Sequence, residues 1–92
     1  MKLIEAVHQL ETLDDESTIY AAEPWNEGSE VIVEQETESG ALPSEAHRLR
    51  LKYFLEVLIA RDFLDGWLST LETEPTIQQK CTRLIQYAVN DA

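Results

Sequence analysis

The chain has 92 residues, of which 43% are hydrophobic and 27% are charged, and its formal net charge at pH 7 is −11. This composition is typical of a folded protein and not of a disordered one, and the length predicts one domain over residues 1–92. A strongly acidic chain without clustered Lys and Arg is unsuited to direct binding of nucleic acid or of an anionic membrane.

The excess acid lies in the first half of the chain. Residues 1–46 contain twelve Asp and Glu and one Lys, whereas residues 47–92 contain six acidic and six basic residues. A basic protein surface is the natural electrostatic complement of such a chain. Acidity that only keeps the protein soluble is the alternative explanation of the same charge.

The N-terminal segment predicts a short amphipathic helix, because Leu3, Val7 and Leu10 form one apolar stripe within residues 2–12. Polar residues interrupt this stripe, so we do not expect a signal peptide. No stretch of the sequence reaches the roughly 18 apolar residues of a membrane-spanning helix. The single cysteine, Cys81, cannot form an internal disulfide. We therefore expect a cytoplasmic protein.

A β-hairpin is predicted next. Residues 17–22, STIYAA, are β-branched and aromatic, and residues 30–36, EVIVEQE, alternate in polarity. Turn-forming residues separate these two strands, which puts Trp25 at the tip of the hairpin. Val31 and Val33 are expected to face the helices. The outer face of the second strand would then carry Glu30, Ile32, Glu34 and Glu36.

A third strand is predicted over residues 49–57, after a loop with a helical turn near Pro43. Apolar and charged residues alternate in this segment except at Phe54. The alternation places Arg50 and Lys52 on the outer face of the sheet, next to the glutamates of the hairpin. We therefore expect cross-strand pairs between these bases and the glutamates.

Two further helices complete the prediction. The apolar period becomes helical over residues 59–72, although a single long helix over residues 49–73 is an alternative. Thr73 or Thr76 is suited to cap the last helix, and Pro75 is suited to its first turn.

The predicted order of elements is α-β-β-β-α-α. This order favours a small two-layer α+β domain, with a three-stranded, mainly antiparallel sheet packed on helices. The open edges of such a sheet can be covered by formation of a homodimer. Phe54 and Leu58, on the polar side of the third strand, are the residues expected in that contact.

Motifs for catalysis or for metal binding are weak. Glu5 and His8 form one E-x-x-H pair, whereas di-iron bundles need two such pairs and further carboxylates. The acidic run at residues 14–16 lacks the spacing of a calcium loop. Cys81 lies on the apolar side of the last helix, where a small core residue is expected. We predict a protein that is not an enzyme, with no catalytic, cofactor-binding or metal-binding residues.

Recognition of another protein is the remaining interpretation. Trp25 is either a binding anchor within a polar rim or a cap that folds back over the core, and the sequence leaves both open. In size and charge the chain resembles immunity proteins and antitoxins that neutralise basic toxins. A mimic of nucleic acid and a self-associating accessory subunit are the alternatives. The residues predicted to contact a basic protein partner are Trp25, Glu23, Glu27, Glu30, Glu34 and Glu36.

Overall fold

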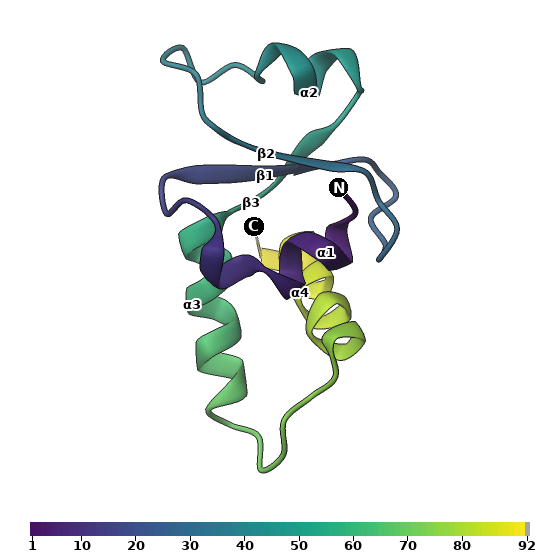
Figure 1. The fold of residues 1–92 in the computed structure, drawn as a ribbon, viewed down its shortest axis with the longest axis vertical. Coiled ribbons are helices and arrows are strands. Elements are labelled where there is room, and N and C mark those ends of the chain that lie inside the picture. Colours follow the sequence, from purple (N-terminus) through teal and green to yellow (C-terminus); the bar gives the residue numbers. More distant parts are fainter. Residues whose placement is uncertain (92) are drawn as a thin grey trace.

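A computed structural model describes residues 1–91, and in it helices cover one face of a three-stranded antiparallel sheet (Figure 1). The elements in chain order are α1 (Leu3–His8), the 3-10 helix η1 (Leu10–Thr12), β1 (Ser17–Ala21), β2 (Val31–Gln35), α2 (Ser44–Arg48), β3 (Lys52–Glu56), α3 (Val57–Leu68) and α4 (Ile77–Asp91). The α+β class and the predicted order are confirmed, and α2 is the helical turn expected near Pro43.

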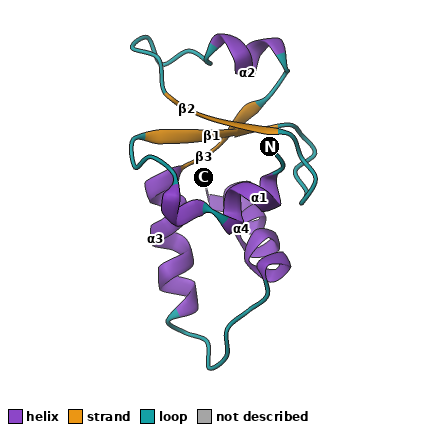
Figure 2. Cartoon of the chain, in the orientation of Figure 1, coloured by secondary structure: helices purple, strands orange, loops and turns teal. Residues whose placement is uncertain are grey.

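The strands are arranged in the order β2-β1-β3, so that β1 is central and pairs antiparallel with both neighbours (Figure 2). Ile19 of β1 lies opposite Val33 of β2 on one side and opposite Leu55 of β3 on the other. The hairpin of β1 and β2 is as predicted. Both β2 and β3 are edge strands, which is where open backbone groups are found.

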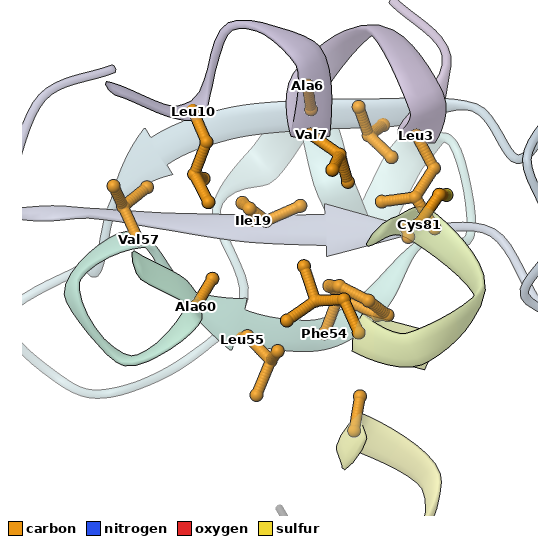
Figure 3. Packing of buried hydrophobic residues seen from close by; sticks show 14 of the residues in the cluster. Leu3, Ala6, Val7, Leu10, Ile19, Phe54, Leu55, Val57, Ala60 and Cys81 are labelled. Carbon is orange, nitrogen blue, oxygen red and sulfur yellow. The ribbon is translucent and has the colours of Figure 1, made fainter. Parts of the chain in front are cut away.

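The main core lies between the sheet and the helices α1, α3 and α4. Figure 3 shows Ile19 near its centre, with Leu3 and Val7 of α1 on one side and Phe54 of β3 on the other. Val31 is buried in this core and Val33 packs against it, which confirms the predicted inward face of β2.

A second, smaller cluster lies on the opposite face of the sheet, which we call the outer face. Tyr20 of β1, Ala46 of α2 and Leu51 are buried together, and Ile32 of β2 packs against them. Figure 1 accordingly shows α2 on the side of the sheet away from the other helices. Because α2 is short, it covers only part of the outer face, and Glu34 remains exposed there.

The third strand differs from its prediction in length and in the direction of its side chains. A β-bulge sets Phe54 and Leu55 against the single residue Ile19, so the alternation breaks at this point. Phe54, expected on the polar side, is 1% exposed, and Tyr53, expected inside, is 39% exposed. Arg50 has a φ of 59° in the turn before β3 and is not part of the strand. The alternative of one long helix is wrong.

The last two helices form a divergent pair (Figure 1). α3 begins directly after β3, two residues earlier than predicted, and ends four residues earlier. The start of α4 is capped as expected, because the Thr76 hydroxyl accepts the N–H of Gln79 at 3.1 Å and the Gln79 amide oxygen accepts the N–H of Thr76 at 2.8 Å. Within residues 1–91, each helix is too short or too polar to cross a membrane.

Candidate protein-binding surface

The hairpin loop, residues 22–30, is folded back against the start of α1. Within the loop, the Asn26 side-chain oxygen accepts the N–H of Gly28 at 2.8 Å, and the Asn26 carbonyl accepts the N–H of Ser29 at 3.0 Å. The N–H of Leu3 donates to the Ser29 carbonyl at 2.8 Å. These bonds satisfy the backbone of the turn and hold the loop close to the core.

Trp25 is therefore directed inward. Its indole N–H donates to the Ala21 carbonyl at 3.2 Å, and its ring packs against the Phe54 ring in a T-shaped arrangement, with centroids 4.8 Å apart and planes at 87°. Edge-to-face contacts of this kind stabilise buried aromatic pairs. Trp25 remains half-buried, so it caps the core at the hairpin end. Its role in binding a partner stays a prediction.

The five glutamates predicted to act with Trp25 fall into two groups at opposite ends of β2. One group lies in the loop and just before β2: Glu23, Glu27 and Glu30. Glu30 already forms an ion pair within the fold, because the amino group of Met1 lies 3.2 Å from its Oε1. The other group lies at the far end of β2: Glu34 and Glu36. The structure thus does not gather the six predicted residues into one site.

Glu34 and Glu36 instead share one face of the sheet with a third glutamate, Glu56. Thr18 of the central strand lies directly opposite Glu34 on β2 and opposite Glu56 on β3. The Thr18 hydroxyl also donates to the Glu36 carboxylate at 3.4 Å. We call Glu34, Glu36 and Glu56 the outer acidic face. Sequence reasoning missed Glu56, because its place next to the other two depends on the strand order β2-β1-β3.

Burial and the negative charge of this face raise the pKa of two tyrosines beside it. Tyr20 and Tyr53 lie opposite each other, in the row next to Thr18. Burial and then the charge of Glu36 raise the pKa of Tyr20, and burial and then Glu56 raise the pKa of Tyr53. Both phenols therefore stay neutral at physiological pH, and the charge of this face comes from its carboxylates.

The bases that were expected to neutralise the outer acidic face do not reach it. Lys52 lies opposite Ala21, which belongs to the main core, because the bulge shifts the alternation of β3. Arg50 lies in the turn before β3. Within residues 1–91, the ion pairs are Met1 with Glu30, Arg48 with Glu45, Arg61 with Asp15, and Lys80 with Glu74. The predicted cross-strand pairs are wrong, and the described residues provide no ion pair to the outer acidic face.

Other candidate reactive groups have structural roles. Cys81 is buried, and burial followed by the charge of Glu27 raises the pKa of its thiol to about 11. A neutral, buried thiol is a poor nucleophile. Glu5 accepts the N–H of Lys2 at 2.7 Å and so caps α1. Among residues 1–91, no group of three or more His, Cys, Asp or Glu side chains could hold a metal ion.

The two residues predicted for a homodimer contact differ in exposure. Phe54 is buried against Trp25, so its expected place in that contact is wrong. Leu58, at the start of α3, is 49% exposed. The homodimer itself stays a prediction.

A hollow opens where α3 and α4 diverge, with Trp67, Leu71 and Arg83 among its lining residues. The Arg83 guanidinium lies 4.8 Å from the centre of the Phe63 ring, which stacks on Tyr87. Arg83 is thus held within the helical layer and is directed to a ring of its own chain. The lining of this hollow contains neither histidine nor cysteine.

The outer acidic face therefore carries three exposed carboxylates, and none of them takes part in an ion pair among the described residues. It is built by three strands that the fold brings together. Compared with known proteins, the chain matches no protein-family model, no curated protein and no solved structure, so its function must be inferred from its own residues.

Proposed function

We propose that this protein is a small acidic binding protein without enzymatic activity, which masks a basic surface of another protein through its outer acidic face. One observation carries the proposal: Glu34, Glu36 and Glu56 gather on one face of the sheet, and the described residues provide no ion pair to them. Carboxylates that are not neutralised within the fold remain available to Lys and Arg of a partner.

The one-sided placement of the charge favours this proposal over solubility alone. Surfaces that serve solubility generally mix both signs of charge. Like charges repel one another, and here Glu34 and Glu56 lie on the two sides of the same residue of the central strand, Thr18. A face of one sign also attracts a cationic partner over a distance and increases the association rate.

The proposal includes a cellular setting and a class of partner. A chain with one cysteine, which is buried, needs no oxidising compartment, and we propose a cytoplasmic location. Immunity proteins and antitoxins that neutralise basic toxins are the functional class that this charge suits. Glu23 and Glu27 lie at the opposite end of β2 from the outer acidic face, and the proposal does not depend on them.

Affinity capture from a lysate of the source cell, with a C-terminal tag and elution by a salt gradient, tests the proposal. Wild type is compared with a variant in which the outer acidic face is neutralised: Glu34→Gln, Glu36→Gln and Glu56→Gln. A charge-matched control neutralises three exposed carboxylates in the helical half: Glu11→Gln, Asp62→Asn and Glu72→Gln.

We expect wild type and the control to retain the same basic protein, which salt releases, and the outer-face variant to lose it. Equal retention by both variants, or capture of no basic protein, would contradict the proposal. Competition between this protein and DNA or RNA for the captured partner would identify the function as mimicry of nucleic acid.

A further inference from the structure

The free edge of β2 presents backbone groups that point away from the sheet. The N–H of Val31 donates to the Met1 carbonyl at 2.8 Å, on the side of β2 opposite to β1. Successive residues of a strand direct their backbone groups to opposite sides. The N–H and C=O groups of Val33 and Gln35 therefore also point away from β1.

Only the beginning of this edge is covered. Lys2 forms an isolated antiparallel bridge with Glu30, which closes the edge at the start of β2. Further along, no strand or bridge of residues 1–91 pairs with the edge at Val33 or Gln35. Val33 is half-buried and Gln35 is exposed. We call the backbone groups of Val33 and Gln35 the open edge. Such groups are a ready template for another strand.

The charges beside the open edge disfavour a second copy of this chain as that strand. Met1 occupies the partner position of Val31, so two copies could pair antiparallel only around Glu34 or Gln35. Either register sets glutamates of the two copies opposite each other, as Glu34 against Glu34 or Glu34 against Glu36. Like charges directly opposite are destabilising. A strand with Lys or Arg at these positions has the complementary charge.

We propose that the open edge receives a basic segment of the partner as a fourth strand, antiparallel to β2. In this arrangement Lys or Arg lies opposite Glu34 and Glu36, and an apolar residue lies opposite Val33. Main-chain hydrogen bonds then provide affinity, and alternate side chains provide specificity. This inference rests on the proposed function and adds the way in which the partner binds.

A synthetic peptide tests the inference without knowledge of the natural partner. Its core is Lys-Thr-Arg-Val-Thr, capped at both ends, which places its bases opposite Glu36 and Glu34 and its valine opposite Val33. The control peptide, Glu-Thr-Glu-Val-Thr, keeps the strand pattern and reverses the charge. In an NMR titration of the isotope-labelled full chain, the basic peptide should slow hydrogen exchange of the Val33 and Gln35 amides, and the acidic peptide should not.

Proline at the open edge separates strand addition from simple charge attraction. Val33→Pro removes an N–H that points away from β1, so the ladder within the hairpin is kept, and edge strands tolerate proline in this position. We expect the affinity for the basic peptide to fall about fivefold to tenfold. Val33→Thr keeps the N–H and the branched shape and should change the affinity by less than about twofold. Gln35→Pro and Gln35→Ala form a second matched pair.

The outcomes distinguish this inference from the proposed function. If both proline variants bind the basic peptide as tightly as their controls, strand addition is overturned, even where Glu34→Gln and Glu36→Gln weaken binding. Protection of the Val33 and Gln35 amides in a dimer of the free protein would also overturn it, because a second copy would then occupy the edge. The proposed function fails on a different result, which is retention of the captured protein by the outer-face variant.

Discussion

The two faces of the sheet differ in how completely their polar and charged groups find partners. On the helical face, Trp25 donates to Ala21, and Arg61 bonds the carbonyls of Leu10 and Leu13. On the outer face, α2 covers one end, and the carboxylates at the other end have no basic partner among the described residues. Stability therefore comes mainly from one face, which leaves the other face available for the proposed binding of a partner.

Two adjacent residues of β3 provide the strongest test of this difference. Phe54→Ala should reduce the free energy of unfolding by about 3–5 kcal/mol, because the side chain is fully buried and supports Trp25. Tyr53→Ala should cost less than about 1 kcal/mol, because Tyr53 is on the open outer face. Urea unfolding measures both values. Similar losses at the two positions would contradict the bulge that sends these neighbours to opposite faces.

The pH dependence of stability tests the core at Cys81. The thiol has a pKa of about 9 when unfolded and about 11 in the folded protein, so the unfolded chain loses its proton first. Between these pH values the unfolded state binds fewer protons, and stability falls as pH rises, by at most about 2–3 kcal/mol in total. Urea midpoints at about pH 8 and about pH 11 measure this fall. Cys81→Ala should reduce it, and an identical fall in the variant would contradict a buried neutral thiol.

Two arginines, one mostly buried and one exposed, extend the comparison with smaller expected effects on stability. Arg61 is mostly buried and bonds Asp15 as well as two backbone carbonyls, whereas Arg48 pairs with Glu45 at the exposed surface of α2. Arg61→Met should cost about 1–3 kcal/mol, because buried acceptors lose their donor. Arg48→Met should cost less than about 0.5 kcal/mol. Thermal unfolding measures both losses of stability. Equal losses for the two variants would contradict the expectation that the buried arginine contributes more than the exposed one.

Local patterns in the sequence were sufficient for much of the fold. The β-branched run of β1, the alternation of β2 and the threonine cap of α4 each depend on neighbouring residues, and each is found as predicted. The α+β class follows from these elements. Such features can be predicted because their causes lie within a few residues of one another.

The candidate surface depended on contacts that are distant in the sequence. The bulge opposite Ile19 changes the faces of Phe54 and Tyr53, and a two-residue period cannot reveal it. Glu56 joins Glu34 only because β1 lies between β2 and β3. The direction of Trp25 depends on Phe54, which is 29 positions away in the chain. Sequence reasoning placed Glu34 and Glu36 on the outer face, but it expected Arg50 and Lys52 beside them and did not include Glu56.

The central claim is that the outer acidic face is not neutralised within the fold. Its most direct test is urea unfolding at low and high salt of wild type and of the variant with Glu34→Gln, Glu36→Gln and Glu56→Gln. Glutamine keeps a hydrogen-bond acceptor beside Thr18 and removes the repulsion, so we expect the variant to be more stable by a few tenths of a kcal/mol at low salt. Added salt should stabilise wild type more than the variant, because it screens that repulsion. A variant less stable by about 1 kcal/mol or more would contradict the claim, because the carboxylates would then be holding the fold together.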